Sequence, residues 1–130
     1  MATHAQHLEQ SGNKLFERFS SIGDTPQSRK TLRHIIAIER WGTSRLRMLL
    51  GEKPFVLDSS RDYYPPEQSA WNVLLDDLKT TRKDLITLVP FLEGKTQKVA
   101  HNMFGELSAR AWLKYLNFHS NAEAMRVRAQ

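Results

Sequence analysis

Apolar side chains recur every three, four or seven residues in four separate segments of this 130-residue chain, and glycine, proline or a polar turn divides the segments. That spacing places the apolar side chains on one face of an α-helix. No segment alternates apolar and polar residues over the length of a strand, and no internal repeat is evident. The sequence therefore predicts an all-α fold.

Glycine, proline and serine mark the ends of the four predicted helices. Glycine favours the position after a helix, proline is tolerated in the first turn, and a serine side chain can cap the first free amides. Four amphipathic helices of this length can enclose one shared core as a four-helix bundle. The predicted helices span residues 7–22, 27–50, 66–92 and 108–127, with a turn at 24–26, Gly23, Gly51 and Gly94 ending the first three and Ser108 capping the last.

The longest segment without helical spacing, residues 52–66, lies between the second and third predicted helices and contains three prolines. A loop of this length is unusual in a compact domain and fits a crossover between two helices that lie parallel. Residues 95–106 form a second irregular link. The sequence therefore predicts one four-helix-bundle domain, residues 1–130, with a long crossover between helices two and three.

The composition limits the chemistry that this bundle can perform. The chain has 40% hydrophobic and 25% charged residues, which is typical of a globular domain. It contains no cysteine, so thiolate metal ligands, cysteine nucleophiles and disulfides are excluded. The sequence also lacks a nucleophile elbow, a phosphate-binding loop and a dinucleotide fingerprint. Any metal site must therefore use histidines and carboxylates.

Charge and hydropathy bear on partners and location. Nineteen basic and fourteen acidic residues give a net charge of +5, which permits an anionic partner without requiring one. The mean hydropathy of -0.52 argues against a membrane protein, and the first residues show no secretory-signal pattern. We therefore expect a cytoplasmic location.

Polar residues continue the apolar face of the last predicted helix. Trp112, Leu116, His119 and Glu123 follow one another at helical spacing, so an imidazole and a carboxylate point to the same side as the core. Because residues four apart sit one above the other, His119 and Glu123 can bind one ion, share a proton or form a plain hydrogen bond.

Three further polar residues fall on or near the apolar faces of helices two and three. Glu39 lies among the apolar residues of helix two, and His34 lies at their edge. Arg82 on helix three must be paired because burying a bare charge is costly, and Glu39 or Glu123 is its expected partner. Two interpretations stay open: a buried Arg82–Glu39 salt bridge with merely hydrogen-bonded histidines, or a metal or catalytic site.

Several strings spread over nearly the whole chain carry a family resemblance. They are Leu32-Arg33-His34-Ile35 with Glu39, the crossover string Asp62-Tyr63-Tyr64, Thr81-Arg82, and His101-Asn102-Met103-Phe104-Gly105-Glu106-Leu107-Ser108 followed by Trp112-Leu113 and His119. Together they resemble the DinB-like superfamily. The resemblance implies a four-helix bundle with a long link between helices two and three, often a homodimer. In many members it also implies a divalent metal bound by three histidines.

The resemblance also implies a ligand set and an activity. The family's ligands fall on His34, His119 and Glu123, the last standing where the family has histidine. Two imidazoles and one carboxylate are a recognised set for Zn²⁺, Fe²⁺ or Ni²⁺. Such an ion would lower the pKa of a bound water or bind a thiolate. We therefore expect a metal-dependent hydrolase or a thiol transferase that acts on a small-molecule or thiol substrate.

Residues outside the ligand set receive their own predictions. We expect Tyr63, Tyr64 and Asn102 to line the mouth of the site, with packing of the loop against the core as the favoured alternative for the tyrosines. His101 is expected to fix the turn before the last helix, not to bind metal.

The competing class is a non-enzymatic, dimeric bundle that acts through a partner surface. A homodimer contact is predicted along the edge of helix two from Trp41 and Met48 to Leu50. Nucleic-acid binding is a weaker prediction because no aromatic platform or helix-turn-helix signature accompanies the basic residues. Those basic residues share one face of helix two and are Arg29, Arg33, Arg40 and Arg47.

Overall fold

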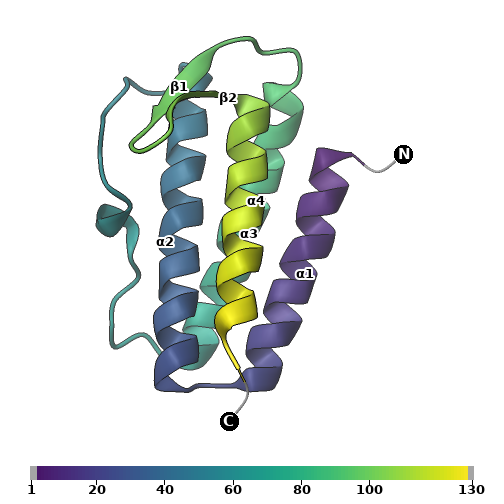
Figure 1. Ribbon diagram of the computed structural model, residues 1–130, viewed down its shortest axis with the longest axis vertical. Coiled ribbons are helices and arrows are strands. Elements are labelled where there is room, and N and C mark those ends of the chain that lie inside the picture. Colours follow the sequence, from purple (N-terminus) through teal and green to yellow (C-terminus); the bar gives the residue numbers. More distant parts are fainter. Residues whose placement is uncertain (1–2, 129–130) are drawn as a thin grey trace.

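Four helices packed side by side form most of the computed structural model, which describes residues 3–128 (Figure 1). Helices α1 and α4 run in one direction, and α2 and α3 run in the opposite direction. The predicted all-α bundle is therefore confirmed. No helix in residues 3–128 is both long and apolar enough to cross a membrane. The helices are α1 (His4–Ile22), α2 (Pro26–Leu49), α3 (Trp71–Leu92) and α4 (Ala109–Arg126).

Side-chain caps explain where three of the helices begin. The Thr3 side chain accepts a hydrogen bond from the Gln6 amide, so α1 starts three residues before the predicted position. Thr25 caps α2 in the same way, which places Pro26 inside the first turn and not in the preceding turn. Ser108 accepts a hydrogen bond from the Ala111 amide, which confirms the predicted cap of α4.

The predicted long crossover between helices two and three is confirmed. It runs beside α2 from one end of the bundle to the other, so α2 and α3 are parallel neighbours (Figure 1). One short 3-10 turn, η1 (Ser60–Tyr63), interrupts it. Helix α3 begins at Trp71 and not at Pro66, because residues 66–69 form a turn closed by a Ser69 to Pro66 backbone hydrogen bond of 3.1 Å.

A small hairpin corrects the prediction that the second link is irregular. Strands β1 (Lys98–His101) and β2 (Gly105–Ser108) pair antiparallel, with Val99 opposite Leu107. The hairpin lies across the end of the bundle, above α2 and α4 (Figure 1). Each strand has only four residues, which is too short for an alternating pattern to stand out in the sequence.

The basic face of α2 holds the crossover in place. Arg33 donates two hydrogen bonds to the Pro65 carbonyl at 3.2 and 2.7 Å, and Arg29 donates to the Ser69 carbonyl at 2.5 Å. Arg40 reaches the Tyr63 carbonyl at 3.3 Å. The predicted outward row of arginines is thus largely engaged by this chain's own backbone.

Of the predicted dimer edge of helix two, Trp41 is buried within the chain, whereas Met48 and Leu50 stay partly exposed. Trp41 is only 3% exposed, because its indole packs edge-on against Trp112 and His101. Met48 and Leu50 are half-buried against the same cluster. Trp41 therefore belongs to the core beneath the hairpin, and a dimer contact along this edge stays a prediction.

Candidate metal site

The antiparallel register of α2 and α4 sets which side chains meet between them. Gly42 allows a close approach, since a Cβ atom at this position would lie 2.4 Å from a methyl carbon of Leu116. One turn toward the N-terminus of α2, Glu39 meets Ser120, whose hydroxyl donates to its carboxylate at 2.5 Å. Closer still to the N-terminus of α2, His34 lies opposite His119 of α4. The close helix contact therefore aligns the polar residues of the two helices.

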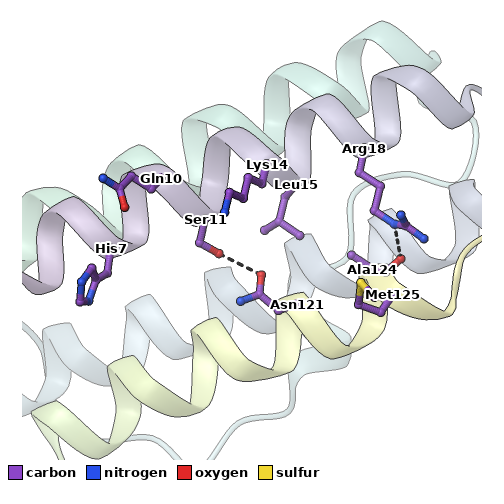
Figure 2. Close-up of a pocket in the computed structure, with 9 residues that line it drawn as sticks. All are labelled: His7, Gln10, Ser11, Lys14, Leu15, Arg18, Asn121, Ala124 and Met125. Carbon is purple, nitrogen blue, oxygen red and sulfur yellow. Dashed lines mark hydrogen bonds between the residues drawn. The ribbon is translucent and has the colours of Figure 1, made fainter.

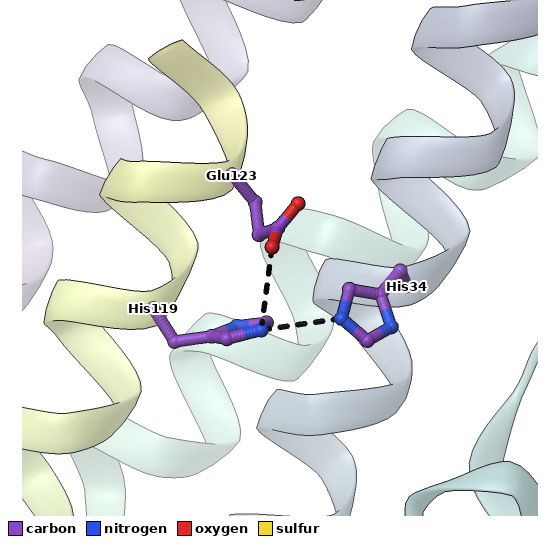
Figure 3. A group of neighbouring side chains, drawn as sticks. All are labelled: His34, His119 and Glu123. Carbon is purple, nitrogen blue, oxygen red and sulfur yellow. Dashed lines mark hydrogen bonds and ion pairs between the residues drawn. The ribbon is translucent and has the colours of Figure 1, made fainter. Parts of the chain in front are cut away.

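His34, His119 and Glu123, here called the triad, converge on one point (Figure 3). The Nε2 atoms of the two imidazoles lie 3.2 Å apart, and His119 Nε2 lies 3.9 Å from Glu123 Oε1. One ligand atom from each of the three residues lies within 4.8 Å of the others. Two ligands of a tetrahedral zinc ion lie about 3.3 Å apart, given metal–ligand bonds of about 2.0–2.1 Å. The two imidazoles already match this spacing, and the Glu123 carboxylate lies slightly farther out.

The protonation of the two histidines suits metal binding. Burial lowers the pKa of His34, and the nearby Glu123 carboxylate only partly opposes this effect. Burial also lowers the pKa of His119, and the positive charge that His34 would carry lowers it further. Both imidazoles are therefore neutral at pH 7, and a neutral imidazole is the form that binds a metal.

The Nδ1 atoms, which point away from the shared Nε2 contact, differ in their hydrogen-bond partners. His34 Nδ1 lies 2.7 Å from the Tyr64 hydroxyl, whereas the buried His119 Nδ1 has no hydrogen-bond partner within residues 3–128. When both Nε2 lone pairs face one ion, both Nδ1 atoms carry protons, and His34 then donates to Tyr64. Tyr64 thus fixes the ring orientation of His34, as outer partners of metal-binding histidines do.

Glu123 is the least constrained member of the triad. Its side chain is 22% exposed, and its Oε1 atom lies 3.4 Å from the guanidinium of Arg126, which is itself 75% exposed. An ion pair this exposed contributes little to stability. The carboxylate is therefore free to exchange this partner for an ion between the histidines.

A second polar cluster lies deeper in the bundle, where Arg82 of α3 meets α2 and α4. Arg82 donates to both carboxylate oxygens of Glu39, at 2.9 and 2.6 Å, and to the Leu8 carbonyl at 2.8 Å. Ser120 supplies a further donor to Glu39. The expected partner of Arg82 is thus Glu39 and not Glu123. The sequence left open whether the interior holds a buried salt bridge or a site at the histidines. The structure contains both the Arg82–Glu39 salt bridge and the triad.

The three residues expected at the mouth of the site are placed in two different regions. Tyr64 borders the triad through His34. The Tyr63 hydroxyl instead donates to Asp58, and the Asn102 amide donates to the Asp58 carbonyl at 2.8 Å. Neither Tyr63 nor Asn102 forms a hydrogen bond with the triad within residues 3–128.

Arg45 connects the residues of that second region, a role that the sequence did not predict. Its side chain is fully buried and pairs with Asp58 at 3.1 Å and with Asn102 at 2.9 Å. It also donates to the Ala100 carbonyl, so it joins the crossover, the hairpin and α2. A signal did exist, because Arg45 continues the spacing of Ile38 and Trp41 on the apolar face of α2.

His101 fixes the turn of the hairpin as predicted. Its Nδ1 atom accepts hydrogen bonds from the Met103 and Phe104 amides at 3.0 and 3.3 Å. Burial lowers the pKa of His101, and Arg45 lowers it further. The neutral ring is enclosed by aromatic side chains, and it belongs to the fold rather than to the triad.

A separate hollow of about 370 Å³ lies between α1 and α4 (Figure 2). Polar side chains are paired across it: Ser11 donates to Asn121 at 2.9 Å, and Arg18 donates to the Ala124 carbonyl at 2.7 Å. These hydrogen bonds tie the first helix to the last. The hollow contains His7 but no second histidine and no carboxylate, so its lining offers no ligand set for a metal.

Comparison with known proteins adds no identification: no family model matches the sequence, and no curated protein or solved structure matches it. The resemblance to the DinB-like superfamily therefore rests on the residues quoted above.

Proposed function

We propose that this protein is a DinB-like four-helix bundle that binds a divalent transition metal, Zn²⁺, Ni²⁺ or Fe²⁺, through His34, His119 and Glu123. The observation that supports this proposal most strongly is the 3.2 Å approach of two imidazole Nε2 atoms beside a carboxylate. Two imidazoles and one carboxylate leave coordination positions open for a further ligand.

The protein's own residues prepare this site in three ways. The close contact between Gly42 and Leu116 brings α2 and α4 together, and the two histidines already face each other at 3.2 Å. Burial keeps both imidazoles neutral. Tyr64 is a neutral phenol at neutral pH, burial raises its pKa further, and its hydroxyl contacts His34.

We propose a hydrolase or a thiol transferase as the activity of the site. A divalent ion held by the triad would supply Lewis-acid chemistry that lowers the pKa of a coordinated water or thiol. The substrate would be a small molecule or a thiol that enters from the crossover side, where Tyr64 and Glu123 border an open pocket.

The competing proposal is a non-enzymatic bundle that acts through a partner surface. The complete pairing of Arg82 with Glu39 favours it, because that cluster explains part of the polar interior without any site. Phe118 and Met125 also favour it, since both are exposed and lie seven residues apart on one face of α4. We propose a homodimer through this face, which light scattering of the purified protein would test.

Metal analysis of untagged protein separates the two proposals. After incubation with Zn²⁺ and dialysis, we expect about one ion per chain in the wild type and much less than one in His119→Ala. His7→Ala is the matched control, because His7 is an exposed histidine on α1 outside the triad. Equal loading of all three proteins, or no loading of the wild type, would favour the non-enzymatic bundle.

A further inference from the structure

An open pocket of about 880 Å³ lies between the first turns of α2, the crossover and the end of α4. Pockets that bind small molecules have volumes in the same range. Two members of the triad, His34 and Glu123, form part of its lining, together with Tyr64. A molecule in this pocket would therefore reach the candidate metal site directly.

Positive charge dominates the lining of this pocket. Four cationic side chains face two carboxylates, Glu67 and Glu123, and Glu123 belongs to the triad. Because the pocket is concave, it concentrates the field of these cations on a bound ligand. The cationic side chains are Arg29, Lys30, Arg33 and Arg126.

Arg33 is the most preorganised of these cations. Its Nε and Nη2 atoms donate to the Pro65 carbonyl, and its guanidinium lies 5.2 Å from the centre of the Tyr64 ring. These contacts fix the side chain but leave its charge uncompensated, since no carboxylate of residues 3–128 forms an ion pair with it. Its Nη1 atom has no hydrogen-bond partner within the same residues. Arg29 differs, because Asp24 pairs with it at 2.9 Å.

We propose that this pocket binds a small organic anion through its carboxylate or phosphate group, with Arg33 as the main anchor and Lys30 and Arg126 as supporting cations. A planar guanidinium recognises both kinds of group. The proposal deepens the proposed function, because the anion would be the substrate or part of it, held beside the triad.

The rest of the basic face argues for a small anion and against a nucleic acid. A nucleic acid needs a row of free cations along its backbone. Beyond the pocket, the row on α2 continues with Arg40 and Arg47, which pair with Asp77 at 3.6 Å and with Glu52 at 3.0 Å. Among the lysines and arginines of α2, only Lys30 and Arg33 form no ion pair within residues 3–128, and both line the pocket.

Tyr64 connects the anion pocket to the triad. Its ring lies beneath Arg33, and its hydroxyl contacts His34 Nδ1. An anion on Arg33 and an ion on His34 would therefore share one positioning residue and attract each other electrostatically. We expect zinc to tighten the binding of the anion, and by linkage the anion to tighten the binding of zinc.

Calorimetric titration of metal-free protein tests the anion pocket directly. The probes are succinate and inorganic phosphate, with succinamide as the neutral analogue of succinate. We expect one of the two anions to bind, with an affinity that falls as the ionic strength is raised, and succinamide not to bind. The tighter of the two anions identifies the group that the pocket prefers.

Substitutions locate the anchor. We expect Arg33→Gln to weaken binding of the anion at least about tenfold. Lys30→Gln should weaken it only about threefold, because the Lys30 side chain is not held in place by a hydrogen bond to the crossover within residues 3–128. Arg40→Gln is the matched control, two turns along the same face of α2, and should change the affinity less than about twofold. Binding of succinamide equal to that of succinate, equal effects of Arg33→Gln and Arg40→Gln, or no binding of either anion would overturn the proposal.

The outcomes for the anion and for the metal are independent. Zinc binding without anion binding would overturn this inference and leave the proposed metal site intact. Anion binding by protein that fails to bind zinc would support the pocket and contradict the metal site.

Discussion

Two polar clusters share helices α2 and α4 but differ in how completely their hydrogen-bonding groups are satisfied, and Arg82 of α3 belongs to the deeper one. In the deeper cluster, Arg82, Glu39 and Ser120 use one another's donors and acceptors at 2.5–2.9 Å. In the triad, the two imidazoles share one Nε2–Nε2 hydrogen bond of 3.2 Å, and His119 Nδ1 has no partner within residues 3–128. The first cluster is complete without a ligand, and the second is not.

This difference teaches how to interpret polar residues inside a helical bundle. Buried polar groups persist where they satisfy one another or serve a site. A closed network fixes the register of the helices, and its loss should be measured as instability. An incomplete cluster beside a pocket should contribute little to stability, and its loss should be measured in binding.

The largest expected effect is the loss of stability in Arg82→Met. This substitution leaves the Glu39 carboxylate buried without its charge partner, so we expect the free energy of unfolding to fall by about 3–5 kcal/mol. Urea denaturation followed by circular dichroism measures the change. A loss below about 1 kcal/mol would mean that the deeper cluster does not hold the bundle together.

The substitution His119→Ala should separate binding from stability. We expect zinc affinity to fall at least about a hundredfold, because one of three ligands is removed. The metal-free protein should lose only about 1 kcal/mol, since the imidazole is not fully satisfied in the fold. Isothermal titration and urea denaturation measure the two quantities. The comparison of the clusters would be wrong if His119→Ala were as destabilising as Arg82→Met.

A smaller effect is expected for Tyr64→Phe. The substitution keeps the ring beside Arg33 but removes the hydroxyl that contacts His34 Nδ1. Loss of such an outer partner lowers metal affinity by about 10-fold to 100-fold. Zinc titration of the wild type and the variant measures this change, with Tyr115→Phe as the control because Tyr115 packs against His119 without a hydrogen bond to it. Equal affinities of wild type and Tyr64→Phe would remove Tyr64 from the site.

The smallest expected effect is the pH dependence of the metal-free protein. Burial lowers the pKa of His119 in the folded state, so the unfolded chain takes up a proton at a higher pH than the folded chain does. Stability from this group is therefore fully present above about pH 6.5 and is lost as the pH falls below that value. We expect His119→Gln to reduce this loss by up to about 1 kcal/mol per pH unit. Urea denaturation at several pH values measures the slopes, and parallel slopes for both proteins would contradict the prediction.

The sequence predicts the helices and the interior polar residues because both follow from one periodic pattern. The spacing that places Leu116 in the core also places His119 and Glu123 beside it, and the same logic makes Arg82 need a partner. Helical spacing shows which face of a helix a side chain lies on but not which residue of the neighbouring helix it contacts. It therefore did not distinguish Glu39 from Glu123 as the partner of Arg82.

Features that depend on the path of the loops were not predictable in the same way. The hairpin was missed because four-residue strands carry too little pattern. The role of the α2 arginines was missed because their partners are backbone carbonyls of the crossover, which no sequence pattern marks. Tyr63 and Tyr64 are adjacent in the sequence, but the 3-10 turn ends at Tyr63 and the backbone is extended at Tyr64. Their hydroxyls therefore contact different partners, Asp58 for Tyr63 and His34 for Tyr64.

X-ray absorption spectroscopy of the zinc-loaded protein tests the central claim most directly, because it counts the imidazoles bound to the ion. The account predicts two imidazole nitrogens at about 2.0–2.1 Å in the wild type, and one fewer in His34→Ala and in His119→Ala. A spectrum that both substitutions leave unchanged would show that zinc binds elsewhere and would contradict the account.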